Sequence, residues 1–213
     1  MRVDALVFDA YGTLYDVHSV ARRCESCFAG KGAQLSQLWR AKQLEYTWQR
    51  SLMQRYVPFS QVTREALAYA CAALGLDSAP HAAALMEEYL HLAPFPEVPA
   101  ALERLKMKRA ILSNGSPDLL DPLVRNSGLR FDAVLSVDEL KIYKPAPQVY
   151  ELAVKRLGVP KERIGFVSSN CWDALGAKSY GFTVYWVNRT GAPVDGLGFT
   201  PDAQVKSLDE ILR

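Results

Sequence analysis

Short, uninterrupted apolar runs recur along the chain, and the earliest is Ala5-Leu6-Val7-Phe8. A run of this kind is typical of a parallel strand buried on both faces. Four later runs predict further strands, at 110–112, 133–135, 164–167 and 183–187. Helical patterns separate them, one beginning at Ser116-Pro117, one over 147–157 and one over 172–180. This alternation predicts an α/β fold with a Rossmann-like core, in which helices cover both faces of a parallel sheet.

The stretch between the first strand and the prolines at 94, 96 and 99 has helical periodicity instead. Apolar residues recur from Leu35 to Leu52 without an intervening Gly or Pro, which predicts one long amphipathic helix. A second helix is predicted from Ala66 to Leu74, with Ser60 as its candidate N-cap, and a third over 85–90. We therefore expect residues 15–95 to form an all-helical cap domain inserted into a core domain of residues 1–14 and 96–213.

The composition is that of a soluble globular protein, since 49% of the 213 residues are hydrophobic and 23% are charged. No apolar run approaches the roughly 18 residues of a membrane span, and the amino terminus enters a strand without the apolar segment of a signal peptide. We therefore expect a cytoplasmic protein that has no membrane partner. The formal net charge of +2, spread along the chain, does not favour nucleic acid as a partner.

Cysteine and histidine do not form a metal-binding pattern. Cys24 and Cys27 have a C-x-x-C spacing, but Cys71 and Cys171 are isolated and supply no second pair. We expect reduced, structural thiols. The three histidines show no mutual spacing that suggests a metal site or a triad, so they are interpreted as surface or boundary residues.

The first strand ends in a lone carboxylate, Asp9, followed by a glycine turn and a hydroxyl at Thr13. Ligands of open α/β sheets bind outside the carboxyl ends of the strands, so Asp9 would be accessible to a substrate there and is a candidate nucleophile. The alternative is that Asp9 merely caps the following turn. Position 11 is a tyrosine, and one carboxylate beside an aromatic ring offers a divalent cation little.

Three later segments also place polar residues after apolar runs or in loops: Ser113-Asn114, Lys144 within KIYKPAP, and Ser168-Ser169-Asn170-Cys171-Trp172-Asp173. In order and spacing the four segments resemble the motifs of the haloacid dehalogenase (HAD-like hydrolase) superfamily. Within it, the chain is similar to the L-2-haloacid dehalogenases in FDAYGTLYD, LWRAKQLEYTW, LSNGS, KPAPQVY and SSNCWD. Metal-dependent relatives carry a second aspartate where this chain has Tyr11 and an acidic cluster where it has Ser168, Ser169 and Asn170.

The resemblance implies a metal-independent enzyme without a cofactor, and it implies a role for each matched residue. Asp9 would attack the α-carbon of a short L-2-haloacid opposite the halogen, giving an aspartyl ester and inverting that carbon. Thr13 would orient Asp9, and Lys144 would offset charge repulsion and keep Asp9 ionised. Ser113, with backbone amides near Tyr11, would anchor the substrate carboxylate.

Arg40 in the long helix, helped by Asn114 and Trp172, is the candidate binding site for the departing halide. A substrate-binding wall would consist of Tyr11, Leu44, Phe59 and Trp172, although such residues more often belong to a core. In the second step Asp173 would activate a water that hydrolyses the ester, with Ser168 and Asn170 positioning the reacting groups. The resemblance adds Tyr150 to this network, although Tyr150 could simply pack its helix against the sheet.

Two other functions stay open. One is a magnesium-dependent phosphatase of the same superfamily, which would need another acid in place of Tyr11 to protonate the leaving group. The other is a non-catalytic binding or scaffolding protein on the same fold. The expected partners are a small 2-halocarboxylate and the halide product, and the resemblance implies a homodimer.

Overall fold

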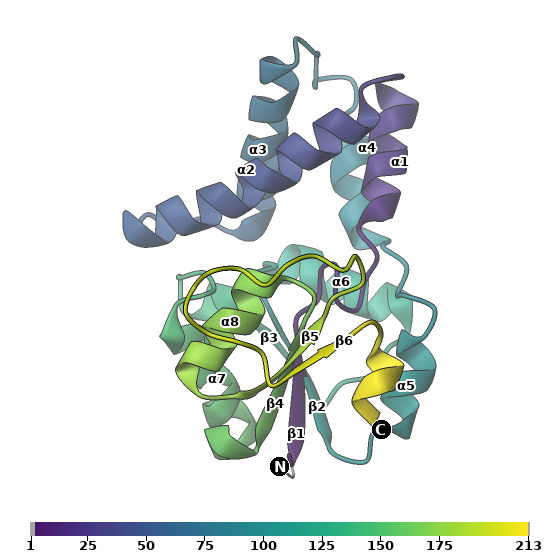
Figure 1. The fold of residues 1–213 in the computed structure, drawn as a ribbon. Coiled ribbons are helices and arrows are strands. Elements are labelled where there is room, and N and C mark those ends of the chain that lie inside the picture. Colours follow the sequence, from purple (N-terminus) through teal and green to yellow (C-terminus); the bar gives the residue numbers. More distant parts are fainter. Residues whose placement is uncertain (1–2, 213) are drawn as a thin grey trace.

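The computed structural model describes residues 3–212 and contains one parallel sheet with strand order β3-β2-β1-β4-β5-β6 (Figure 1). The strands are β1 (Ala5–Phe8), β2 (Lys108–Ser113), β3 (Ala133–Ser136), β4 (Ile164–Ser168), β5 (Thr183–Val187) and β6 (Ala203–Val205). All residues of β1 and β4 are buried, as their uninterrupted apolar sequences predict. The five predicted strands and the parallel α/β fold are confirmed.

Within the described residues, the sheet-containing part of the chain has four α-helices: α5 (Val98–Arg104), α6 (Pro117–Ser127), α7 (Pro147–Leu157) and α8 (Cys171–Tyr180). Helices α7 and α8 pack together on one side of the sheet, and α5 lies on the opposite side beside the 3-10 helix η4 (Leu208–Leu212) (Figure 1). Short 3-10 helices also occur at η2 (Val137–Glu139) and η3 (Lys161–Arg163). Helices therefore cover both faces, as predicted.

The inserted segment is helical: α1 (His18–Cys27), α2 (Gly32–Leu52), α3 (Phe59–Ala73), α4 (Ala82–Glu87) and the 3-10 helix η1 (Glu88–Leu90). These helices stand above the carboxyl ends of the strands (Figure 1). The prediction that Ser60 caps α3 is wrong. Pro58 is the N-cap, because its extended backbone leads directly into the helix, and Ser60 lies within the first turn, where its N–H donates to Ser116 Oγ at 3.1 Å.

Two antiparallel connections join the insertion to the core. The Asp16 N–H donates to the Ala93 carbonyl at 2.8 Å, and the Phe95 N–H donates to the Leu14 carbonyl at 2.9 Å. The chain therefore leaves and re-enters the core at neighbouring points. This geometry supports the division into a cap of residues 15–95 and a core of residues 1–14 and 96–213, which stays our proposal.

The remaining expectations concern single residues and membrane spans. His18 and His91 are exposed, His81 is half-buried, and the four cysteines are free. Within residues 3–212 no helix is both long and apolar enough to cross a membrane.

Candidate active site

The site begins where β1 ends, between the two strands that flank it. The Phe8 backbone pairs with Ile111 of β2 on one side and with Val167 of β4 on the other. The Asp9 N–H extends this ladder by donating to the Val167 carbonyl at 2.9 Å. The strand order reverses at β1, since connections run outward in both directions from it, and ligands of doubly wound sheets bind at such a point.

Three donors hold the Asp9 carboxylate. Thr13 Oγ1 donates to Asp9 Oδ2 at 3.0 Å, and Asn170 Nδ2 donates to the same oxygen at 2.8 Å. Lys144 Nζ lies 3.2 Å from Oδ1. Because Asp9 is buried, these contacts replace water around an ionised carboxylate. They also fix the direction in which its oxygens point.

The turn after Asp9 depends on Gly12, whose φ of +83° lies in the left-handed region. This turn brings Thr13 back to Asp9. Ser169 N–H donates to Thr13 Oγ1 at 2.8 Å and thereby orients the hydroxyl that binds Asp9. Ser169 was not among the predicted site residues, and its only signal in the sequence was its place between the two candidates Ser168 and Asn170.

Lys144 lies between two buried carboxylates, Asp9 and Asp173. Its Nζ is 2.9 Å from Asp173 Oδ2, and both side chains are almost completely buried. Burial alone would lower the pKa of Lys144, but Asp173 and Asp9 outweigh that effect and raise the pKa. Lys144 therefore stays cationic and balances one of the two negative charges.

Asp173 lies in the first turn of α8 and is completely buried. Burial raises the pKa of its carboxyl to about 6, while Lys144 opposes this rise and Asp9 adds to it. Tyr150 donates its phenol hydrogen to Asp173 Oδ1 at 2.9 Å. Burial and then the charge of Asp173 raise the pKa of Tyr150, which consequently remains a donor. A carboxylate with these properties can act as a general base.

Three other predicted site residues, Ser168, Asn114 and Ser113, accept hydrogen bonds from backbone N–H groups around the site. Ser168 Oγ accepts from the Asn170 N–H at 3.1 Å, so in this structure it shapes the turn that presents Asn170. Asn114 Oδ1 accepts from the Lys144 N–H at 3.0 Å and holds the lysine loop to the end of β2. Ser113 Oγ accepts from the Gly115 N–H at 3.0 Å.

Arg40 approaches from α2 and is held within the cap. Its Nη1 donates to Gln43 Oε1 at 2.6 Å, and Gln43 Nε2 donates to Thr63 Oγ1 at 2.7 Å. Gln43 and Thr63 are completely buried, so the acceptor that holds the half-buried Arg40 is itself fixed by a hydrogen bond shielded from water. Neither Gln43 nor Thr63 was predicted from the sequence, because a polar side chain on a helix is expected to face solvent unless its buried partner is known.

The predicted wall residues lie on both sides of the cap–core boundary. The Tyr11 ring stacks on Phe59 at 5.9 Å between centroids. Leu44 is half-buried on α2, one turn after Arg40. Trp172 is half-buried and meets the edge of Trp48 at 5.5 Å. Side chains from α2, α3 and α8 are thus arranged around the ends of the strands.

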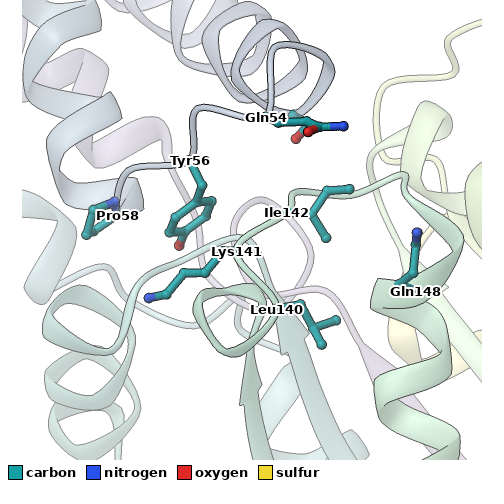
Figure 2. Close-up of a pocket in the computed structure, with 8 residues that line it drawn as sticks. Gln54, Tyr56, Pro58, Leu140, Lys141, Ile142 and Gln148 are labelled. Atoms are coloured by element: carbon teal, nitrogen blue, oxygen red, sulfur yellow. The ribbon is translucent and has the colours of Figure 1, made fainter.

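Two cavities among the described residues adjoin the segment 140–146, which carries Lys144. Figure 2 shows one of about 690 Å³, where Gln54, Tyr56 and Pro58 face the segment 140–142 across an open space. That cavity contains none of the predicted site residues. The other, about 550 Å³, is largely apolar and has Lys144, Trp172 and Trp48 in its wall. The second cavity therefore borders the segment that supplies Lys144 to the network.

The donor set around Asp9 favours an ammonium over a divalent cation. Among the described residues, His, Cys, Asp and Glu form no group of three or more that could hold a metal ion. The position between Asp9 and Asp173, where two carboxylates could share a cation, is filled by Lys144 Nζ.

Comparisons with known proteins agree with this arrangement. Residues 3–181 match the family model of haloacid dehalogenase-like hydrolases. The (S)-2-haloacid dehalogenase of Pseudomonas sp. (strain YL) is 52% identical over 99% of this chain and 94% of its own. A crystal structure of an L-2-haloacid dehalogenase superposes with a TM-score of 0.97 at 47% identity, covering 100% of this chain and 98% of that one.

A second solved structure is the L-2-haloacid dehalogenase of Xanthobacter autotrophicus with chloropropionic acid covalently bound. It has a TM-score of 0.92 and 42% identity, and the match covers 99% of this chain and 97% of that one. Sequence and structure therefore agree over nearly the full length of the chain, which belongs to the L-2-haloacid dehalogenase family of the haloacid dehalogenase-like hydrolases.

Proposed function

We propose that this protein hydrolyses the carbon–halogen bond of short-chain L-2-haloacids and releases D-2-hydroxyacids, with Asp9 as the nucleophile. The observation that carries the proposal is the buried Asp9–Lys144–Asp173 network. In it, three donors orient the Asp9 carboxylate, and the pKa of Asp173 is raised to about 6. The covalent chloropropionic acid adduct of the Xanthobacter relative supports the same chemistry.

In the first step a carboxylate oxygen of Asp9 attacks C2 of the substrate from the side opposite the halogen. A carbon–oxygen bond forms, the carbon–halogen bond breaks, and the halide leaves with its electron pair, so that the configuration at C2 inverts. Orientation of this kind can lower a barrier by about 7–11 kcal/mol. The donors Thr13, Asn170 and Lys144 supply that orientation for Asp9.

Substrate binding divides between core and cap. Ser113 and nearby backbone amides anchor the substrate carboxylate, and Lys144 offsets its charge. Arg40, Asn114 and Trp172 receive the halide, while Tyr11, Leu44 and Phe59 enclose the alkyl group. The contact of Tyr11 with Phe59 and the fixed position of Arg40 support this division.

In the second step water attacks the carbonyl carbon of the aspartyl ester. Asp173 accepts one proton of that water. The acyl carbon–oxygen bond then breaks, and the departing alkoxide takes the second proton of the water and becomes the product hydroxyl, which keeps one original Asp9 oxygen. Asp9 is thereby regenerated as a carboxylate. Tyr150 and Lys144 keep Asp173 in place by hydrogen bonds at 2.9 Å each. Asn170 orients the ester, and Ser168 orients Asn170.

Metal independence is part of the proposal. A positive charge is already supplied between the two carboxylates by Lys144. A magnesium-dependent phosphatase would in addition need an acid near Asp9 to protonate the leaving group, and the residue at that position is the buried, aromatic Tyr11.

The test measures halide release from both enantiomers of 2-chloropropionate with a chelator present, beside phosphate release from a phosphomonoester with magnesium. Chloride from the L enantiomer alone is expected, and Asp9→Asn should abolish it. Magnesium-dependent phosphate release without chloride would overturn the proposal. In a single turnover in heavy-oxygen water the product hydroxyl should be unlabelled, because its oxygen comes from Asp9. Label in the product of the first turnover would show that water attacks C2 directly and would refute Asp9 as the nucleophile.

The homodimer and the cytoplasmic location predicted from the sequence also remain proposals. Exposed apolar side chains at the end of α2, Leu52 at 85% and Met53 at 60%, support an interface between two copies. Light scattering should give the mass of two chains, and a monomer at micromolar concentration would refute the dimer.

A further inference from the structure

The hydroxyl of Tyr11 is a buried polar group without a hydrogen-bond partner among the described residues. Tyr11 is 3% exposed, so water does not replace the missing partner freely. An unpaired buried hydroxyl destabilises the folded state, whereas a phenylalanine at the same place would keep the ring and avoid that cost. A tyrosine here therefore suggests a partner that is present only when substrate is bound.

The hydroxyl faces the point where β2 ends and α6 begins. A Cβ on Gly115 would lie 3.0 Å from the Tyr11 hydroxyl, 2.9 Å from its ring and 3.2 Å from Ser113 Oγ. Only glycine leaves room for the phenol at this position. Because α6 begins at Pro117, the hydroxyl also lies near the N-terminal end of an 11-residue helix, where the backbone dipoles favour an anion.

The ring cannot turn the hydroxyl away from this point. It lies 5.9 Å from both Phe59 and Tyr89, measured between ring centroids, and it is stacked on the first and meets the edge of the second. Burial raises the pKa of the phenol, and Arg40 is the cation that opposes this effect. Tyr11 is therefore a protonated donor in a fixed position, and Arg40 is the cationic group that acts on it.

We infer that the Tyr11 hydroxyl donates a hydrogen bond to the halogen as it leaves, and so acts with Arg40 as a determinant of halogen preference. This inference rests on the proposed function. The phenol keeps its proton throughout, while the electron pair of the carbon–halogen bond passes to the halide. Ser113, 3.2 Å from the same Gly115 position, remains the anchor of the substrate carboxylate.

The predicted signature follows from the charge density of the leaving group. A hydrogen bond to chloride is stronger than one to bromide, since the same charge occupies a smaller ion. Loss of a hydrogen bond to a charged group corresponds to roughly a 10- to 100-fold loss of rate. Tyr11→Phe should lower single-turnover chloride release by about this factor and bromide release by less, which raises the ratio of bromide to chloride rates.

The experiment compares L-2-chloropropionate and L-2-bromopropionate in the wild-type protein, Tyr11→Phe and Tyr15→Phe. Tyr15 is a matched control because its phenol is buried in the same turn but pairs with Ser127 Oγ at 3.0 Å. Tyr15→Phe should leave the halide ratio unchanged. Tyr11→Phe should also melt at the same temperature as the wild type or above it, because it removes an unpaired buried hydroxyl.

The other outcomes separate failure of the proposed function from failure of the role assigned to the Tyr11 hydroxyl. Failure of the wild-type protein to release halide from either substrate would refute the proposed function and this inference together. Normal wild-type turnover with an unchanged halide ratio in Tyr11→Phe would refute the inference alone. Equal slowing of both substrates would assign the hydroxyl to the carboxylate or to the fold, and a lower melting temperature would mean that it already has a partner.

Discussion

Tyr150→Phe should shift the acidic limb of the pH profile of turnover to higher pH, and should not lower turnover equally at every pH. The phenol of Tyr150 donates to Asp173 Oδ1 at 2.9 Å, and Lys144 donates to Oδ2 at the same distance. Because a hydrogen bond to the charged form stabilises that form, its removal must raise the pKa of Asp173 further. Tyr150 is thus predicted to lower the pKa of Asp173, the proposed general base.

The free energy of the lost hydrogen bond sets the size of the shift in the pKa of Asp173. A hydrogen bond to a charged group contributes about 1.5–3 kcal/mol, and one pKa unit corresponds to about 1.4 kcal/mol. The pKa of Asp173, about 6 in the wild-type protein, should therefore rise by roughly 1–2 units in Tyr150→Phe. At pH 7 turnover should fall roughly 2- to 10-fold, and it should recover as the pH is raised above the new pKa.

The assay is the pH profile of kcat for L-2-chloropropionate between pH 5 and about 10, under conditions where ester hydrolysis limits turnover. Tyr180→Phe is the matched control, since its ring lies 6.0 Å from that of Tyr150 without bonding to Asp173. A loss of activity that is uniform across the profile would contradict the reasoning and make Tyr150 a packing residue. An acidic limb that stays at its wild-type position would do the same.

Two further predictions concern the charged groups. Lys144→Met should destabilise the protein by about 3–5 kcal/mol at pH 7, because it leaves two buried carboxylates without their cation, and by less at pH 5, where carboxylates protonate more readily. Urea unfolding of Lys144→Met is compared with that of Lys141→Met, which removes only an exposed ion pair with Asp138 and should cost much less free energy of unfolding. Equal losses in the two variants would contradict the argument from burial. Arg40→Ala should slow halide release far more than Lys141→Ala, with Gln43→Leu between them because Arg40 loses its acceptor. Burst kinetics check this order, and wild-type behaviour in Gln43→Leu would refute the positioning role.

Much of the core could be predicted because its signals are local. Apolar runs mark strands that are buried on both faces, and the carboxyl ends of parallel strands meet, so Asp9, Ser113 and the segment 168–173 had to converge. The bounds of α7 followed from Pro147 at its first position and the glycine after Leu157. Strand β6 was missed, since three residues with an exposed Gln204 carry little periodic signal.

The polar contacts within the site were harder to predict. Gln43 and Thr63 lie on different helices, and their pairing depends on how α2 packs against α3. Helices α1 and α5 were not identified as separate elements, since short segments of 10 and 7 residues give weak patterns. The missing hydrogen-bond partner of the Tyr11 hydroxyl depends on the packing of Phe59, Tyr89 and Gly115, none of which is near Tyr11 in the sequence.

The ion network joins positions that are far apart along the chain. Lys144 is separated by 135 residues from Asp9 and by 29 from Asp173. Closing such long loops costs conformational entropy, so contacts of this range form only when the sheet that supports them is assembled. During folding these three charges remain hydrated until β1 and β4 pair. Catalytic competence is therefore expected to arise in the same cooperative event that completes the core, and an excised fragment lacking any of the three segments could not retain it.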